Sequence, residues 1–306
     1  MKVYVAKKAG FCAGVERALD IVMRKAHDND RTPVFTYGPL IHNPHVVKRL
    51  AALGIKTTDN INNIPRGSYL VIRSHGIGPT ERNLIKQHGL RIIDATCVHV
   101  KRLQKIVRDL YGAGYKLIIL GLRDHPEIKA LRDFVGDDCI IANSINELPT
   151  FDGSVPKVGV VAQTTLSTDF FEKAVAHFMD QPIEELVIKE TICYATIKRQ
   201  EAAKELGEKV DLMIVIGGLD SSNTRKLAEV CQSKGVRTYH VESPGQIKDE
   251  WLEGVQNIGL TAGASTPDWM IDHVLRDLEE KGYKYAPQDE EEGGLFDCLD
   301  SGEVSK

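Results

Sequence analysis

Three cysteines occupy equivalent places in this chain: Cys12, Cys97 and Cys193. Each begins a segment whose apolar residues recur with helical spacing, in FCAGVERALDIV, TCVHVKRLQKIVRDL and ICYATIKRQEAAKEL. The start of a helix favours a thiolate, because the helix dipole stabilises negative charge there and lowers the thiol pKa. Three equivalent thiols can meet near a threefold axis, and one shared metal centre is the simplest use of that geometry.

The number and spacing of these thiols narrow the choice of metal centre. The chain has no C-x-x-C pair, although structural zinc usually takes four protein ligands that include such close pairs. A four-iron cluster usually takes four cysteines. With three, one iron has no protein ligand and can bind substrate as a Lewis acid, while electrons enter through the cluster. This arrangement suits redox or dehydration chemistry at an oxygen substituent.

Polar loops that recur after each cysteine carry hydrogen-bond donors and one acid. They supply His42, His75, His125, Glu127, Thr164, Ser221, Ser222, Asn223 and Ser265. Histidines, hydroxyls and amides beside helix N-termini bind anions, phosphate in particular. Lysine and arginine are scarce in these loops, so a compact diphosphate fits them better than a nucleotide. Glu127 is the candidate proton donor, because Asp124 and Asp220 are the only other carboxylates close to these donors.

Single members of this set also have purely structural explanations. Ser222 could cap a helix, and His42 and His125 could be turn residues beside prolines. Glu127 could be a first-turn glutamate that the helix dipole alone favours. Their repeated position at strand ends, together with three equivalent cysteines, favours a common site.

The elements that position these residues form a repeated α/β unit. In each copy, the cysteine helix leads to an apolar strand that ends at glycine: VFTYG, KLIILG and LMIVIGG. A loop, a helix and a short strand follow, and a third apolar strand ends in the polar loops SHG, QTT and AGAS. Continuous apolar strands that alternate with helices indicate a mainly parallel sheet covered on both faces. Ligands bind beyond the carboxyl ends of such strands, where all of these loops lie.

The repeat predicts an α/β fold of three pseudo-symmetric lobes. Their expected ranges are 1–96, 97–192 and 193–285, and the acidic segment 286–306 is expected to be a mobile tail. If the strand ends of the three lobes point to one centre, the cysteines and the polar loops line one cavity. The alternative is three independent domains with unrelated pockets, in which the shared cysteine position would be a coincidence.

Composition argues against several classes of protein. The net charge of −4 gives no electrostatic footprint for nucleic acid. No apolar run approaches the ~20 residues of a membrane span, and MKVYVAKKAGFC predicts a strand rather than a signal peptide. We therefore expect a cytoplasmic protein, where reduced thiols bind metal or do chemistry. Cys139 and Cys231 are interpreted as small buried apolar residues, and Cys298 lies in the tail.

A series of motifs occurs in one order along the chain: FCAGVERA, IHNPHVV, SHGI, DATC, HPEI, QTTLS, ICYAT-x-x-RQEA, SSN and TAGAS-x-PD. In these motifs the chain resembles the 4-hydroxy-3-methylbut-2-enyl diphosphate reductases of the non-mevalonate isoprenoid pathway, from residue 1 to about residue 285. The resemblance implies a trefoil of α/β lobes around one [4Fe-4S] cluster per chain. It also implies that an allylic hydroxyl is removed as water with two electrons and two protons, which gives isopentenyl and dimethylallyl diphosphate.

The same resemblance implies roles for individual residues. The three cysteines hold the cluster. Glu127 is the proton donor, and His125 and Thr164 contact the substrate near the reacting hydroxyl. The diphosphate is bound by His42, His75, Ser221, Ser222, Asn223 and Ser265. An external electron donor such as ferredoxin or flavodoxin is also implied.

Three departures from the family pattern concern details of the pocket. Val98 and His99 stand where the family commonly has Pro-Leu or Pro-Phe. LRD precedes His125, where small residues are more usual, and GGLD precedes Ser221, where a lysine or arginine is frequent. None of the departures falls on a matched functional position.

Three alternatives stay open at this point. A cluster-dependent hydro-lyase would use the same three cysteines and would turn over without a reductant. A non-enzymatic iron–sulfur or redox-sensing protein would need no anion site, so the histidine and serine loops argue against it. A zinc phosphate-binding module would differ in colour and metal content.

Overall fold

The structure of this chain is a computed structural model, which describes residues 1–28 and 30–287. Three parallel sheets form its frame. The first has the order β3 (Lys56–Thr58), β2 (Val34–Tyr37), β4 (Tyr69–Ile72) and β5 (Arg91–Asp94). The second has the order β7 (Cys139–Ala142), β6 (Lys116–Leu120), β8 (Lys157–Ala162) and β9 (Glu185–Lys189). The third has the order β11 (Arg237–Val241), β10 (Leu212–Ile216), β12 (Asn257–Ala262), β1 (Lys2–Val5) and β13 (Lys284–Tyr285).

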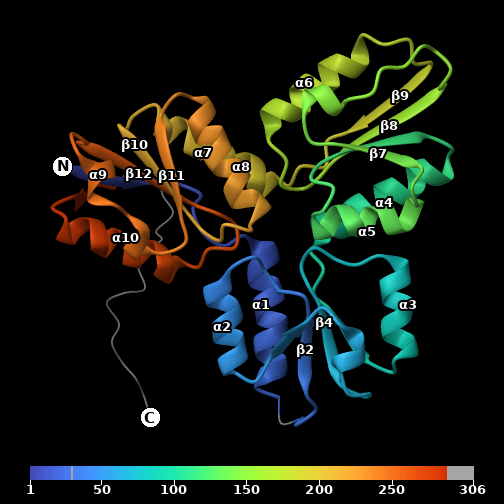
Figure 1. Cartoon of the computed structure of the whole chain (residues 1–306), viewed down its shortest axis with the longest axis horizontal. Coiled ribbons are helices and arrows are strands. Elements are labelled where there is room, and N and C mark those ends of the chain that lie inside the picture. Colours follow the sequence, from blue (N-terminus) through green and yellow to red (C-terminus); the bar gives the residue numbers. More distant parts are fainter. Residues whose placement is uncertain (29, 288–306) are drawn as a thin grey trace.

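Helices flank the sheets, and the three resulting lobes surround a common centre (Figure 1). In chain order the helices are α1 (Ala13–Ala26), α2 (Pro44–Ala52), α3 (Pro79–Gln87), α4 (Val98–Gly112), α5 (Pro126–Val135), α6 (Thr168–Met179), α7 (Tyr194–Gly207), α8 (Ser222–Ser233), α9 (Asp249–Leu252) and α10 (Asp268–Glu280). Short 3₁₀ turns lie at Ile61–Asn63, Ile145–Glu147 and Pro244–Gln246. The predicted α/β fold of three lobes in a trefoil is confirmed.

Each sheet buries both faces, which explains why its central strands are apolar throughout. In β4, Val71 packs with α1 and α2 on one side, while Leu70 and Ile72 pack with α3 on the other. Alternate residues of a strand point to opposite faces, so a strand between two layers of helices needs apolar residues at every position. Within the described residues, no helix combines the length and apolar character that crossing a membrane requires.

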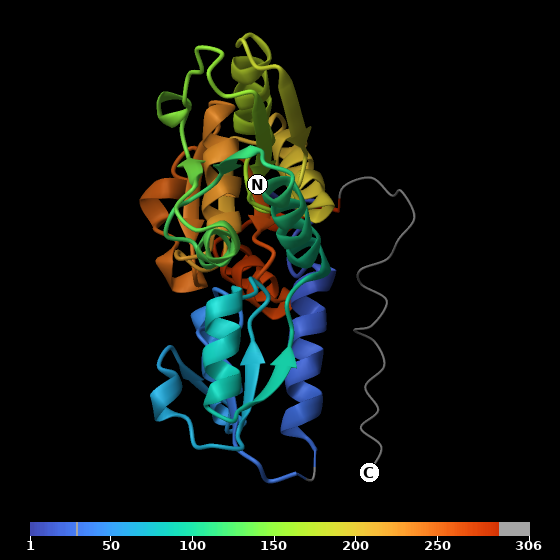
Figure 2. The same cartoon turned by 90° about the vertical axis from the view of Figure 1, so that its right-hand side faces the viewer.

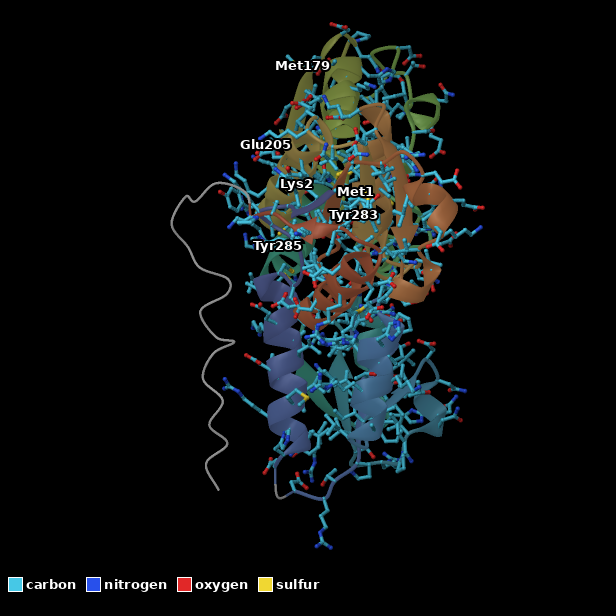
Figure 3. The ribbon with its side chains drawn as sticks, turned by 90° about the vertical axis from the view of Figure 1, so that its left-hand side faces the viewer. Met1, Lys2, Met179, Glu205, Tyr283 and Tyr285 are labelled. Atoms are coloured by element: carbon cyan, nitrogen blue, oxygen red, sulfur yellow. The ribbon has the colours of Figure 1, made fainter. Side chains whose placement is uncertain are left out.

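One strand of each sheet differs from the sequence prediction: β5 and β9 were not predicted, and β1 was assigned to the wrong sheet. The strands β5 and β9 carry polar residues at their ends and are only partly buried, so they lack the continuous apolar run that marks a central strand. The strand β1 was predicted, but the expected lobe 1–96 assigns it to the wrong sheet. It lies between β12 and β13 in the third sheet, with Lys2 opposite both Asn257 and Lys284. Figure 3 shows Met1 and Lys2 beside Tyr283 and Tyr285.

The three cysteines lie where the chain passes from one lobe to the next. Cys97 follows β5 of the first sheet and begins α4, which packs on the second sheet. Cys193 follows β9 of the second sheet and begins α7, which packs on the third. Cys12 follows β1 of the third sheet and begins α1, which packs on the first. The helices α1, α4 and α7 therefore lie on one side of the trefoil, along the right-hand edge of Figure 2.

The burial that the sequence predicts for the remaining cysteines is confirmed for Cys231 and wrong for Cys139. Cys231 is buried in the core beneath α8, as predicted. Cys139 is only half-buried, and its thiol faces the Gly136 carbonyl oxygen at 3.8 Å, so its predicted burial is wrong. Residues 288–306, which hold Cys298 and nearly all of the predicted tail, lie outside the described residues.

Candidate functional site

The three cysteines share one backbone arrangement. Each is the residue before the first turn of its helix, and none uses its side chain to cap that helix. Each cysteine N–H donates to a carbonyl oxygen of the loop after the third strand of the preceding lobe. The pairs are Cys97 to Ser74 at 3.0 Å, Cys193 to Thr164 at 2.9 Å and Cys12 to Ala264 at 3.3 Å. The threefold repeat in sequence is therefore a threefold repeat of local geometry.

The thiols line one central cavity and have space between them for a bound group. A Cβ atom added at Gly14 would lie 2.7 Å from the sulfur of Cys97 and 3.7 Å from that of Cys12, so the missing side chain keeps this region clear. Three thiolates on one zinc ion lie within about 4.6 Å of one another, since the Zn–S distance is about 2.3 Å. Among the described residues, the group close enough for one ion is instead His42, His75 and His125, within 4.8 Å. The thiol spacing fits a larger group such as a cluster better than a single ion.

The thiol pKa values of two of the cysteines are raised, although the sequence predicted that they would be lowered. Burial raises the pKa of Cys97 and of Cys193, and it outweighs the backbone N–H groups in the first turns of α4 and α7, which act in the opposite direction. The predicted lowering of the thiol pKa by the helix start is therefore wrong for these two residues without a metal. A metal that binds here must displace their protons, which couples its affinity to pH.

All of the predicted site residues reach this cavity. Three lobes contribute to its lining, which includes Cys12, His42, His75, Cys97, His125, Glu127, Thr164, Cys193, Ser221, Ser222, Asn223 and Ser265. Three unrelated pockets are thus excluded. The placement brings the residues together; their individual roles stay predictions. Thr165, which the sequence places beside Thr164 in the same polar loop, also lines the cavity, whereas Gly14 and Arg199 are lining residues that the sequence did not single out.

Three neutral histidines form one wall. The ring centroids of His42 and His75 are 4.7 Å apart, and those of His75 and His125 are 5.2 Å apart. Burial lowers the pKa of all three, that of His125 to about 3, so none is charged at neutral pH. His125 Nδ1 accepts the Glu127 N–H at 3.2 Å, which leaves the proton on Nε2 as a donor.

Unpartnered polar atoms in this region point to a ligand. Among the described residues, His42 Nε2, His75 Nδ1 and Asn223 Nδ2 are buried without a hydrogen-bond partner. A buried polar group without a partner costs about 1–3 kcal/mol, and native proteins avoid that cost. Donors of this kind on one cavity match the predicted anion site.

Glu127 lines the same cavity as the three histidines and the three cysteines. Its side chain is 1% exposed, and one oxygen accepts the Thr164 N–H while the other accepts the Thr164 hydroxyl, each at 2.7 Å. Burial raises the pKa of Glu127 to about 7, although both hydrogen bonds act to lower it. The carboxyl therefore holds a proton for much of the time near neutral pH, as a general acid must.

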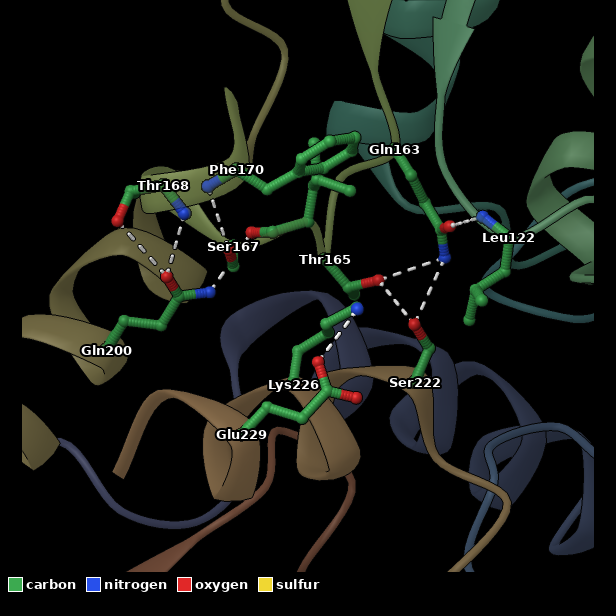
Figure 4. Close-up of polar contacts among 11 residues, drawn as sticks. Leu122, Gln163, Thr165, Ser167, Thr168, Phe170, Gln200, Ser222, Lys226 and Glu229 are labelled. Atoms are coloured by element: carbon green, nitrogen blue, oxygen red, sulfur yellow. Dashed lines mark hydrogen bonds and ion pairs between the residues drawn. The ribbon is translucent and has the colours of Figure 1, made fainter. Parts of the chain in front are cut away.

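The hydroxyls of Thr165 and Ser222 form a second wall of the cavity, called the hydroxyl wall below. Gln163, a residue that the sequence did not single out, orients both hydroxyls (Figure 4). Its Oε1 accepts the Leu122 N–H at 3.0 Å, so its Nε2 must face the hydroxyls. This Nε2 donates to Thr165 at 3.0 Å and to Ser222 at 3.3 Å, and the two hydroxyls lie 3.0 Å apart. Both oxygens act as acceptors from Gln163, so a hydroxyl proton remains to be donated to a ligand.

Residues of the first and third lobes make hydrogen bonds to one another beside the cavity. Asn43 donates from Nδ2 to the Ser265 carbonyl oxygen at 2.9 Å, and the Ser265 hydroxyl lies 3.4 Å from that of Ser221. A side chain at Gly218 would overlap the carbonyl oxygen of His42. Ser221 also accepts the Thr224 N–H at 3.3 Å and so caps α8, so a helix-capping residue can also line the cavity.

The departures from the family pattern lie mostly at the rim. Val98 is 59% exposed and Leu219 is 47% exposed. Arg123 points away from the predicted donors and donates to the Ile141 carbonyl oxygen at 3.4 Å. Only His99 lines the cavity.

Comparison with known proteins connects this geometry to a family. The family model described as LytB protein matches residues 3–279. The chain belongs to the LytB protein family. A curated relative from Pelobacter propionicus, named 4-hydroxy-3-methylbut-2-enyl diphosphate reductase, is 41% identical over 283 residues, which cover 92% of this chain and 98% of the relative.

Two solved structures agree with this assignment. One, titled as the structure of (E)-4-hydroxy-3-methyl-but-2-enyl diphosphate reductase, the terminal enzyme of the non-mevalonate pathway, is 36% identical with a TM-score of 0.65; it covers 92% of this chain and 100% of its own. The other is the E-1-hydroxy-2-methyl-but-2-enyl-4-diphosphate reductase from Plasmodium falciparum. It is 28% identical with a TM-score of 0.87, over 96% of this chain and 93% of its own. These LytB relatives are named reductases, so the hydro-lyase alternative is not favoured.

Proposed function

We propose that this chain reduces 4-hydroxy-3-methylbut-2-enyl diphosphate to isopentenyl diphosphate and dimethylallyl diphosphate. The observation that carries this proposal is one cavity that combines three equivalent thiols, a buried acid and a wall of neutral donors. Membership of the LytB family, with relatives named after this reaction, supports the same substrate. A hydro-lyase would not need an electron source, whereas this reaction consumes two electrons and two protons.

Cys12, Cys97 and Cys193 would hold one [4Fe-4S] cluster. Their equivalent loops, their spacing and the clearance at Gly14 fit a group of that size and symmetry. When bound, the cluster would supply electrons and an iron without a protein ligand, as three-cysteine ligation leaves one such site. The protein then has to orient the substrate and control protons around it.

The surrounding residues divide this work. His42, His75 and the hydroxyl wall would bind the diphosphate through donors that carry no charge of their own. His125 and Thr164 would position the substrate near Glu127, which would give its proton to the departing hydroxyl oxygen. Because the diphosphate does not change in the reaction, its contacts should chiefly affect KM, whereas Glu127 should chiefly affect kcat.

Electrons would come from an external acidic carrier such as ferredoxin or flavodoxin, in the cytoplasm. Val98 and Tyr194, which directly follow two of the cysteines, are 59% and 67% exposed. The whole chain carries a net charge of −4, yet basic residues outnumber acidic ones among the first five residues of the three cysteine helices. The basic residues are Arg17, Lys101, Arg102 and Lys198, and the acidic one is Glu16. Turnover driven by such a carrier should fall with added salt, whereas turnover driven by a neutral reduced dye should not.

The decisive experiment is anaerobic. The purified protein is analysed for iron and visible absorption, and it is then mixed with the allylic hydroxy-diphosphate and a reduced low-potential dye. A brown protein that oxidises the dye only with substrate supports the proposal. Cys97→Ser should lose the colour, and Cys139→Ser, which changes a half-buried cysteine outside the cavity, should keep it. A colourless protein that contains zinc and stays inactive after cluster reconstitution would refute it.

A further inference from the structure

Arg199 is a buried cation beside the cysteine centre that the proposed reaction does not use. It lies on α7, its side chain is 4% exposed, and it lines the central cavity. Its Nη2 donates to the Gly10 carbonyl oxygen at 2.8 Å, and its Nη1 donates to that of Ala195 at 3.1 Å. Arg199 thus joins the loop before Cys12 to the first turn after Cys193.

The charge of Arg199 has no carboxylate partner in the described part of the chain, where the ion pairs involve other residues. Burial lowers the pKa of Arg199, and the groups that act in the opposite direction are the thiols of Cys12 and Cys193 when they are ionised. Its Nε is also buried without a hydrogen-bond partner. By contrast, burial also lowers the pKa of Arg73, but the carboxylates of Glu81 and Asp59 act to raise it. A buried guanidinium with only thiols to balance it is costly unless the site it faces is negative.

We propose that Arg199 is a positioning residue with two effects on the three-cysteine centre: it holds the Cys12 loop against the Cys193 helix, and its fixed charge raises the midpoint potential of the bound cluster. The inference rests on the proposed function, because it assumes that the cysteines hold a redox-active cluster. Reduction adds a negative charge to the centre. A cation in a poorly screened interior favours that state, so a reduced cluster becomes easier to form.

Arg17 provides a matched comparison on the first cysteine helix. Its Nη1 donates to the Thr96 carbonyl oxygen at 3.2 Å, next to Cys97, as Arg199 does for the loop before Cys12. Arg17 is exposed, however. Solvent screens a charge in that position, so it should contribute little to the potential.

The test measures the midpoint potential of the reconstituted full-length protein without substrate, by a dye-mediated titration followed by electron paramagnetic resonance. Arg199→Gln removes the charge at similar size, Arg199→Lys keeps it, and Arg17→Gln is the control. We expect Arg199→Gln to shift the reduction equilibrium at least about tenfold toward the oxidised cluster. For a one-electron couple this is about 59 mV to more negative potential. Arg199→Lys and Arg17→Gln should shift it by less than about a third of that amount.

Several results would overturn the inference. If the midpoint potential of Arg199→Gln equals that of the wild type, the charge of Arg199 does not affect the cluster. If Arg17→Gln shifts the potential as much as Arg199→Gln does, the buried position of Arg199 is not what matters. If Arg199→Gln cannot be loaded with cluster, Arg199→Lys must load and keep the wild-type potential; otherwise the charge is not the cause. The potential titration needs no substrate, so it is independent of the turnover assay. A wild-type protein that holds the cluster but does not reduce the substrate would refute the proposed reaction, and the potentials of the variants could still be compared.

Discussion

Glu127→Gln is the substitution that tests the assignment of the acid most directly. Glutamine has nearly the same shape, and its oxygen can still accept the Thr164 N–H while its amide can donate to the Thr164 hydroxyl. The site should therefore keep its geometry and lose only the transferable proton. Removing a positioned general acid costs about 100- to 10,000-fold in rate, or about 3–5 kcal/mol in the activation free energy.

The pH dependence follows from the same residue. Burial raises the pKa of Glu127 to about 7, so the acid form declines as the pH rises through 7. The wild-type kcat should fall over that range. Because the folded-state pKa is raised, the stability linked to this group is highest below its unfolded pKa and is lost as the pH rises through the folded one. The loss is at most about 3 kcal/mol between pH 5 and 8, and the glutamine variant should not show it.

Steady-state kinetics with the reduced dye, from pH 6 to 9, and urea unfolding at pH 5 and pH 8 measure both effects. Glu81→Gln is the control, because Glu81 is also a first-turn glutamate soon after a proline but accepts a hydrogen bond from Tyr37 away from the cavity. We expect it to leave kcat and its pH profile unchanged. If Glu127→Gln kept more than about a tenth of the wild-type kcat, or if its loss appeared in KM alone, Glu127 would not be the proton donor.

Two further substitutions test the frame around the cluster and the diphosphate. Gly14→Ala places a methyl group 2.7 Å from the sulfur of Cys97, so it should reduce the iron content per chain by more than half. Gly112→Ala, where nothing lies within 4 Å of the added Cβ atom, should leave the iron content unchanged. A normal iron content in Gly14→Ala would contradict the proposed fit of the cluster. Gln163→Glu should raise KM about tenfold with little change in kcat, because a carboxylate would accept the Ser222 proton that the glutamine leaves free. A tenfold lower kcat at unchanged KM would argue against this orientation of the hydroxyl wall.

Much of the site could be predicted because its residues occur at strand ends in a repeated unit. Cys97 and Thr164 illustrate this: each belongs to a loop whose equivalents occur in the other lobes, so position along the repeat implies position in space. The neutral histidines and the raised pKa of Glu127 could not be predicted in this way, since both depend on how completely three lobes exclude water.

Other parts depend on contacts that a single segment does not reveal. Arg199 looks like an ordinary helical arginine in RQEAAKEL, and its hydrogen bond to the Gly10 carbonyl oxygen, 189 positions away in the sequence, could not be predicted from that segment. The polar ends of β5 and β9 hide two strands at sheet edges, where one side needs no partner. The apolar run of β1 marks it as a strand, but pairing with β12 rather than β2 is decided by the fold of the whole chain.

That pairing has a consequence for synthesis on the ribosome. The strand β1 emerges first, yet both of its neighbours, β12 and β13, belong to the last part of the described chain to be made. The first two sheets can form while synthesis continues, whereas the third cannot close before its final strands are released. Because β1 leads directly into Cys12, the last of the three thiols to reach its final position is the first in the sequence. A cluster delivered before β12 and β13 are made would therefore meet Cys12 before the strand that leads to it is fixed in the third sheet.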